Sequence, residues 1–378
     1  NYVDFFGDDY AENATALITT IRKTLGRQAW SPEAAIATLS HASSEDRPMV
    51  VERLTKEMIS DPRRRIALND LVAAETRNAL DTLHDEDQFP RTLAGADDDE
   101  KIVGAAATAA KSWALVEPFC RSLRVATRWG TPDDLAPWAT ALRGLVGMAN
   151  KPHSGNTIAV ALLHLPGLAC LMTTGVAAVW AGQYANLRVL AVDAKTAPKF
   201  EENRWPLVAA TDLWTASDGN NVVANVLARS TAVGESPEES LQHFRTAGNG
   251  KYYTPVSEWL HAVLKPMFRD QFYDPEDFDL EFDRAEVLLG ALATDFLIQE
   301  ANRQDRSRSR HTGWFGRATW RSRNRPSDPL ANFRSELKTE GASWAPLRSG
   351  LFGSDPDRAH QAFEKYGETF QAVAARQF

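Results

Sequence analysis

Residues 274–296, DPEDFDLEFDRAEVLLGALATDF, decide the fold class. Asp274 can cap free N–H groups, Pro275 has no N–H to lose at the first helical position, and Glu276 meets the positive end of the helix dipole. Apolar side chains then recur every three or four residues, at Phe278, Phe282, Ala285, Leu289, Leu292 and Phe296. Because this spacing puts them on one face, the stretch predicts a long helix with a buried stripe.

The same start signal recurs along the chain. A short polar residue precedes proline, usually with an acid next, at Ser31-Pro32-Glu33, Asp61-Pro62, Thr131-Pro132-Asp133, Ser236-Pro237-Glu238 and Asp355-Pro356-Asp357. Ser236 and Glu239 also have the spacing of a capping box. Further apolar stripes with helical spacing lie at residues 17–25, 135–145 and 259–267. We therefore predict a mainly α fold, an irregular multi-helix array or bundle.

Evidence for strands is thin. Residues 187–192 and 222–226 are short and apolar, but neither has a hairpin partner joined by a recognisable turn. We interpret both as helix or loop, so few or no strands are expected. We find no repeat of fixed period, which argues against a regular array of helical repeats.

The composition fits a folded chain of about two or three domains. Of 378 residues, 43% are hydrophobic, and the 11 Trp fit closely packed helices or contact surfaces. The net charge of −8 argues against a surface built as a whole for nucleic acid. Because Cys120 and Cys170 lack CxxC spacing, we interpret them as reduced structural thiols of a cytoplasmic protein.

Loops divide the sequence. Residues 84–100 are rich in Asp and Glu and are interpreted as an acidic linker, residues 151–156 are a polar break, and residues 302–329 show the strongest shift in composition. We expect four segments: an N-terminal helical segment at 1–90, a central helical domain at 101–300, an Arg/Trp-rich loop at 301–329 and C-terminal helices at 330–378.

Residues 154–187 form an uncharged run without Asp, Glu, Lys or Arg. The run is long enough to cross a membrane. However, Pro166-Gly167 interrupts it, its apolar residues are largely Ala, Gly and Thr, and its flanks carry no charge cluster. We therefore expect a buried helical hairpin and no membrane span. Small residues such as Gly175 and Ala178 would let neighbouring helices approach closely.

Residues 303–325 form a basic segment, with eight arginines, a single acid (Asp305) and interleaved aromatic rings. Arginine forks bind phosphate and aromatic rings stack on bases, so the functional interpretation is a nucleic-acid or phosphate contact. The alternative is a solvated loop, or one packed against acidic parts of the same chain. The candidate contact residues are Arg306, Arg308, Arg310, Arg317, Arg321, Arg323, Trp314 and Trp320.

Known catalytic motifs are either incomplete in this sequence or absent from it. Asp193-Ala194-Lys195 has the acid-x-Lys form of a metal nuclease, but the preceding thirty residues hold no second acid. Gly248-Asn249-Gly250-Lys251 lacks the first Gly of a phosphate loop. The eight His show no zinc pattern, and the acids at 97–100 and 276–283 are interpreted as solvated faces. We therefore expect no metal and no cofactor, and we assign no catalytic residue.

Four stretches carry a resemblance, namely residues 61–68, 128–130, 165–184 and 350–358. Together they resemble the helical carboxy-terminal regions of large bacterial proteins. In those proteins a SIR2-like, TIR-like or P-loop NTPase module precedes a long helical region, often in phage defence. The resemblance implies a sensing, scaffolding or oligomerising role, and it carries over no active-site residue.

The leading hypothesis is a non-catalytic, cytoplasmic helical sensor or scaffold region that binds a protein partner or an upstream module of its own chain. The chain begins at Asn1 without Met or a signal region, from which we expect it to be part of a longer protein. The alternative is a nucleic-acid-binding module, or a nucleic-acid-processing enzyme, that uses residues 303–325. An oligomer is compatible with either hypothesis.

Overall fold

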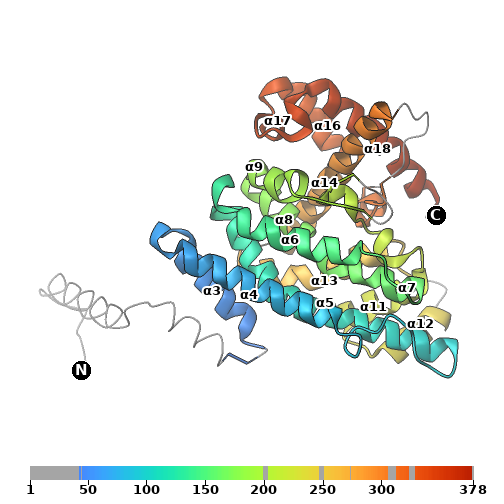
Figure 1. Ribbon diagram of the computed structural model, residues 1–378. Helices are drawn as coiled ribbons and strands as arrows, with labels where there is room; N and C mark the ends of the chain where they lie inside the picture. Colours follow the sequence, from blue (N-terminus) through green and yellow to red (C-terminus); the bar gives the residue numbers. More distant parts are fainter. Residues whose placement is uncertain are drawn as a thin grey trace, which may run out of the picture. The chain divides into compact units, whose positions relative to one another are not determined.

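A computed structural model describes residues 42–43, 45–198, 203–246, 251–272, 274–304, 312–322 and 328–376 (Figure 1). The chain divides into two compact units, Asn1–Val50 and Val51–Phe378. All helices after α3 and both strands belong to the second unit. The segment boundaries expected from composition, at residues 90, 101, 301 and 330, also fall inside the second unit.

Helices dominate the described residues, which confirms the predicted mainly α class. The longer ones are α3 (Arg47–Ile59), α4 (Arg65–His84), α5 (Asp98–Trp129), α6 (Ala136–Ala149), α8 (Leu165–Ala181), α11 (Asn221–Val233), α12 (Pro237–Thr246), α13 (Pro255–Leu264), α14 (Pro275–Arg303), α16 (Pro329–Glu340) and α18 (Pro356–Arg376). The short α-helices are α7 (Thr157–Ala161), α9 (Tyr184–Leu187), α10 (Leu207–Ala210), α15 (Arg317–Arg321) and α17 (Ala345–Arg348).

Single turns of other helix types connect these elements. The 3-10 turns are η1 (Pro62–Arg64), η2 (Pro132–Asp134), η3 (Leu162–His164), η5 (Thr215–Ser217), η6 (Lys265–Phe268), η7 (Gly341–Ser343) and η8 (Leu351–Ser354), and η4 (Arg188–Asp193) is a π-helix. Residues 187–192 and 222–226 are therefore helical, as expected. The sheet of the described residues is one antiparallel ribbon of β1 (Lys195–Thr196) and β2 (Trp205–Pro206), which pairs Lys195 with Pro206 and Thr196 with Trp205.

The proline-marked helix starts are confirmed wherever the structure describes them. The carboxylates of Asp61, Asp274 and Asp355 each accept a hydrogen bond from the backbone N–H two residues ahead. Ser236 and Glu239 form the expected capping box, with N–H···O distances of 2.9 Å and 3.2 Å. Two expectations lie outside the described residues: the start at 31–33 and the stripe at 17–25.

The uncharged run is helical, but the expected hairpin is wrong. Pro166 occupies the first turn of α8, where an N–H would have no intrahelical partner. Ala161 and Leu165 keep right-handed helical dihedrals, so the chain continues through α7, η3 and α8 without turning back. Among the described residues this one stretch, Thr157–Ala181, is long and apolar enough to cross a membrane, and its apolar window lies wholly buried inside the fold.

Helix α8 lies at the centre of the second unit and packs against α5, α6 and α14. Close approach depends on its small residues, as expected. A Cβ added at Gly175 would lie 3.1 Å from Leu289 Cδ1 and 3.3 Å from the Ala285 Cβ of α14. On the α5 side, the buried thiols of Cys120 and Cys170 are free and lie 3.7 Å apart. Burial raises the pKa of the Cys170 thiol well above its usual value.

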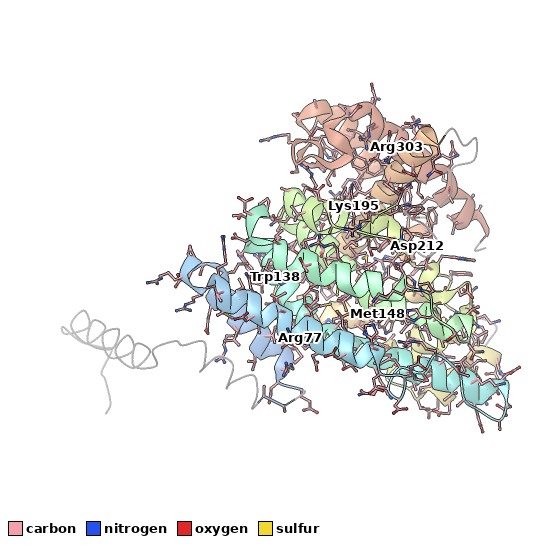
Figure 2. The ribbon with its side chains drawn as sticks, in the orientation of Figure 1. Arg77, Trp138, Met148, Lys195, Asp212 and Arg303 are labelled. Carbon is pink, nitrogen blue, oxygen red and sulfur yellow. The ribbon has the colours of Figure 1, made fainter. Side chains whose placement is uncertain are left out.

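Helices α16 to α18 pack around an aromatic cluster beside α14, drawn in orange and red in Figure 1. Phe333, Trp344, Phe352 and Phe363 are all buried, and neighbouring rings in this cluster lie 5.6 to 6.3 Å apart between centroids. Trp138 of α6, labelled in Figure 2, is also fully buried. Several of the tryptophans thus serve the close packing of helices that their number indicated.

Candidate functional site

The structure describes only part of the basic segment. Arg306, Arg308, Arg310 and Arg323 lie outside the described residues. The other four candidate contact residues, Trp314, Arg317, Trp320 and Arg321, lie in or just before the short helix α15.

Arg317 and Arg321 are buried and face acids of the same chain. One turn apart on α15, they meet Asp279 and Asp283, which are also one turn apart on α14. Arg321 Nε lies 2.8 Å from Asp283 Oδ2, and Arg321 Nη2 lies 3.2 Å from Asp279 Oδ2. Arg317 Nε lies 3.4 Å from Asp283 Oδ1. Asp279 and Asp283 are only 8% and 4% exposed, so the expected solvated face at 276–283 is wrong at these two positions.

The two tryptophans of the segment donate to groups within the chain. Trp314 is fully buried and its Nε1 donates to Val208 O at 2.8 Å. Trp320 Nε1 donates to Glu258 Oε1 at 3.1 Å. From α18, the Tyr366 hydroxyl donates to Trp314 O at 2.7 Å. This part of the segment is therefore anchored from three helices rather than held out in solvent.

Glu286 of α14 lies at the bottom of this charge network and is fully buried. It accepts hydrogen bonds from Ser257 Oγ at 2.5 Å and from the Gly316 backbone N–H at 2.7 Å. Burial raises the pKa of Glu286 to about 8, against those hydrogen bonds. Gly316 has no side chain because an added Cβ would collide with Glu286 Oε2 and Ser257 Oγ. We call Glu258, Asp279, Asp283, Glu286, Arg317 and Arg321 the buried charge network.

His261 extends the network towards the surface. Its Nε2 lies 2.7 Å from Asp279 Oδ1, and Lys265 Nζ lies 3.0 Å from the same oxygen. Burial lowers the pKa of His261 to about 4, so the ring is neutral near pH 7. Burial raises the pKa of Asp279, but hydrogen bonds from His261 and Lys265 outweigh it and hold that pKa well below its usual range. A carboxylate can only accept, so His261 Nε2 carries the proton and Nδ1 is left as an acceptor.

A hollow of about 480 Å³ adjoins His261, between α11, α13, η6 and the start of α14. A neutral imidazole oriented by a carboxylate is an arrangement that general bases use. The hollow's other lining residues are mostly apolar or basic, including Phe268, Phe272 and Arg269. No side chain that supplies a nucleophile is paired with His261, among the hydrogen bonds of the described residues. The arrangement by itself therefore defines no reaction.

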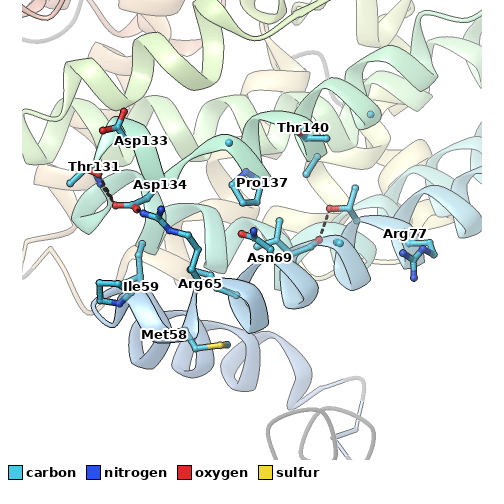
Figure 3. A pocket seen from close by; sticks show the side chains of 18 of the residues that line it. Met58, Ile59, Arg65, Asn69, Arg77, Thr131, Asp133, Asp134, Pro137 and Thr140 are labelled. Carbon is cyan, nitrogen blue, oxygen red and sulfur yellow. Dashed lines mark hydrogen bonds and ion pairs between the residues drawn. The ribbon is translucent and has the colours of Figure 1, made fainter. Parts of the chain in front are cut away.

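A groove of about 1070 Å³ runs along α4 and α6 (Figure 3). Small residues open it, because Ala73 on α4 and Ala136 and Ala141 on α6 leave space between the two helices. Its remaining apolar lining includes Met58, Ile59, Leu68, Val72, Leu80 and Pro137. We call this hollow the α4–α6 groove.

Acids dominate the charged rim of the α4–α6 groove. Four aspartates line it against two arginines: Asp61, Asp81, Asp133, Asp134, Arg65 and Arg77. Arg65 pairs with Asp134 at 2.5 Å and Asp61 pairs with Arg63 and Arg64 on η1. Within the part of the chain that the structure describes, the carboxylates of Asp81 and Asp133 form no ion pair. Residue spacing along α4 gave no sign of this groove, because it depends on how α6 packs beside α4.

The structure gives no further support to the acid-x-Lys motif at 193–195 or to the partial phosphate loop at 248–251. Asp193 ends η4 and pairs with Arg188 at 3.1 Å, and Lys195 begins β1. In the stretch Gly248-Asn249-Gly250-Lys251, residues 248–250 lie outside the described residues, and Lys251 lies over the ring of Phe244. Among the described residues, no three His, Cys, Asp or Glu side chains gather in a way that could hold a metal ion.

No protein-family model, curated protein or solved structure matches the chain.

Proposed function

We propose that this chain is a helical sensor or scaffold region that binds an amphipathic helix in the α4–α6 groove. The helix belongs to a partner protein or to an upstream module of a longer chain that contains this one. The observation that carries the proposal is the groove itself: a hollow of about 1070 Å³ between two helices, with an apolar floor and an acidic rim.

The shape and floor of the groove suit a helix. Grooves between helices take amphipathic helices, which insert apolar side chains spaced three or four residues apart. Val72 and Ala141 are buried in the floor, while Ala73 and Ala136 stay exposed at its edges. Small side chains on both walls let the backbone of an inserted helix approach α4 and α6 closely. Burying this apolar surface supplies the main favourable free energy of such an association.

The rim specifies the charge of the partner. Asp81 and Asp133 have no ion-pair partner in the described residues, and of the rim's two arginines only Arg77 is likewise unpaired, so a small excess of negative charge remains in the lining. Carboxylates at the rim of an apolar groove favour lysine or arginine beside the inserted apolar face and repel acidic helices. We therefore propose a partner helix with an apolar face and basic flanks.

Site-specific photocrosslinking in the full-length protein tests this proposal. A photoreactive residue at position 73 lies in the groove, and the same residue at Asn78 lies exposed on α4 outside the groove lining. We expect the probe at 73, and not at 78, to join a helix with basic flanks, identified by mass spectrometry. Products that are the same from both positions, or none from position 73, would contradict the proposal.

The alternative function, nucleic-acid binding through residues 303–325, depends on Arg306, Arg308, Arg310 and Arg323. Arg317 and Arg321 are committed to acids of α14. Filter binding across a salt series tests the alternative, because counterion release makes affinity fall steeply with salt. A steep loss with salt that disappears when Arg306, Arg308 and Arg310 become Glu would replace the first proposal. Salt-independent or absent binding would dismiss the alternative.

A further inference from the structure

A second hollow, of about 470 Å³, lies between η4, the β1–β2 ribbon, α14 and the turn η8. Five cations line it, Arg188, Lys195, Arg204, Arg303 and Arg358, and we call it the basic cleft. Lys195 and Arg303 are labelled in Figure 2. Its volume falls in the range of sites that enclose small molecules.

Three of the five cations are neutralised by acids that line the same cleft. Arg188 pairs with Asp193 at 3.1 Å, Arg303 with Glu300 at 3.0 Å, and Arg358 with Asp295 at 2.6 Å. Lys195 begins β1, Arg204 directly precedes β2, and both side chains are exposed. Among the described residues neither of them forms an ion pair, so the described lining, with five cations and three acids, has two positive charges in excess.

The turn η8 closes one side of the cleft in a strained conformation. Phe352, Gly353 and Ser354 have φ angles of 54°, 66° and 58°, and Gly350 before them has 86°. Phe352 and Ser354 are in the left-handed region, which residues with a Cβ rarely adopt and which is often found at ligand sites. Burial of the Phe352 ring against Trp344 and Phe363 holds this conformation in place.

The glycines of this turn position two of the arginines. An added Cβ at Gly350 would collide with Arg188 Nη1, and one at Gly353 would lie 2.5 Å from Arg358 Nη1. Both guanidinium groups therefore pack directly on the backbone of the turn. Asp295, which is 7% exposed, fixes Arg358 further through contacts to both Nε and Nη2. Arg358 is thus held in place before any ligand arrives.

One wall of the cleft is apolar. Leu292, Phe296 and Val208 line it, and Phe296 is half-buried with its ring tilted against Trp205 at a centroid distance of 5.3 Å. Arg303 Cζ lies over this ring, 6.0 Å from its centroid. A flat aromatic group would stack on the ring beside or in place of that guanidinium, while an anionic group meets Lys195 and Arg204. Excess positive charge beside an aromatic wall suits a nucleotide, which has anionic phosphates and a flat base.

We propose that the basic cleft binds a phosphorylated small molecule of nucleotide size, with its phosphates at Lys195 and Arg204 and its base against Phe296. This site goes beyond helix docking and shares no residue with the α4–α6 groove. A failed crosslink at position 73 would therefore not contradict the nucleotide site. Absence of nucleotide binding would likewise not contradict helix binding in the α4–α6 groove.

Titration calorimetry with ADP, ATP and pyrophosphate on the whole chain tests the proposal. We expect ADP or ATP to bind with one site per chain, and the double variant Lys195→Glu/Arg204→Glu to weaken that binding about tenfold or more. The matched control is Lys111→Glu/Lys338→Glu. It changes the net charge equally at two exposed positions outside the cleft. We expect it to bind like the unmodified chain.

The variant Phe296→Ala distinguishes the contribution of the base from that of the phosphates. It should weaken ADP binding and leave pyrophosphate binding unchanged. Absence of nucleotide binding to the unmodified chain, or binding that Lys195→Glu/Arg204→Glu leaves intact, would overturn the site. Pyrophosphate binding as tightly as ADP would overturn the assignment of a base to Phe296.

Discussion

The buried charge network and the basic cleft both combine arginines with acids of α14, yet they differ in what surrounds the charges. In the network, Arg317 and Arg321 are 4% and 8% exposed, and each meets more than one carboxylate. In the cleft, Lys195 and Arg204 are exposed and have no acidic partner among the described residues. The comparison shows that a high number of arginines in a segment does not by itself predict a binding site. Cations left without partners beside a hollow are the better sign.

The largest loss of stability is expected when an arginine is removed from the buried charge network. Arg317→Ala leaves the buried Asp283 and the half-buried Glu258 beside a single remaining arginine, and breaking a buried pair in this way costs about 3–5 kcal/mol. Urea denaturation of the variant measures the loss. Arg303→Ala is the control, since that side chain is 64% exposed, and it should change the unfolding free energy by less than about 0.5 kcal/mol. Equal effects of the two changes would contradict the distinction between the two regions.

A smaller loss is expected where the backbone approaches the network. Gly316→Ala places a methyl group against Glu286 Oε2 and Ser257 Oγ, and such overpacking costs about 1–3 kcal/mol. Gly104→Ala is the matched change on α5, where the nearest atom to the new Cβ is Ala94 O at 3.9 Å. It should stabilise the helix by about 0.5–1 kcal/mol. Thermal unfolding of both variants gives the comparison, and destabilisation by both would speak against a special role for Gly316.

The network also predicts how stability depends on pH. The pKa of Glu286 is raised to about 8 in the folded chain, so the folded state holds a proton that the unfolded state has released. Stability should therefore fall as pH rises from about 6.5 to 8, by at most about 1.4 kcal/mol per pH unit. Below about pH 6.5 His261 opposes this trend, because its lowered pKa makes acid favour the unfolded state.

Glu286→Gln isolates the part played by Glu286. Glutamine copies the protonated acid and can keep both hydrogen bonds, so this variant should lose the fall in stability above pH 6.5. Urea midpoints at pH 6.5, 7.2 and 8.0 measure it. A slope that persists in Glu286→Gln would assign the pH dependence to another group.

The smallest effect is expected in the basic cleft. Lys195→Glu/Arg204→Glu removes no ion pair of the described residues, so the unfolding free energy should change by less than about 0.5 kcal/mol. Circular dichroism during thermal unfolding checks this. A loss comparable to that of Arg317→Ala would show that these two cations serve the fold, as the network does.

Local signals in the sequence predicted most of the fold. Caps such as Asp274 and Ser236 act within a few residues, so their hydrogen bonds follow from the sequence alone. The hairpin at Pro166 failed because proline breaks a helix only in its interior, and the sequence does not reveal that Pro166 starts a new turn.

The candidate sites were harder to predict because they depend on contacts between distant residues. Asp279 and Asp283 resemble solvated acids until α15 brings arginines to them. The α4–α6 groove and the basic cleft exist only once helices and turns from separate parts of the chain have packed. Composition alone identified the basic segment. Its described arginines are paired with acids, which agrees with the alternative that the segment packs against acidic parts of the same chain.

The network has a consequence for the order in which the chain folds during synthesis. Arg321 follows Asp283 by 38 residues, and Tyr366 follows Trp314 by 52. When α14 leaves the ribosome, Asp283 still lacks Arg317 and Arg321, so this part of the inner face of α14 stays hydrated until α15 has been made. Helix α18 is made later still, and its Tyr366 hydroxyl then donates to Trp314 O, just before α15. Ribosome-bound chains that end before residue 312 should therefore be open to proteases along α14, and complete chains should be protected there.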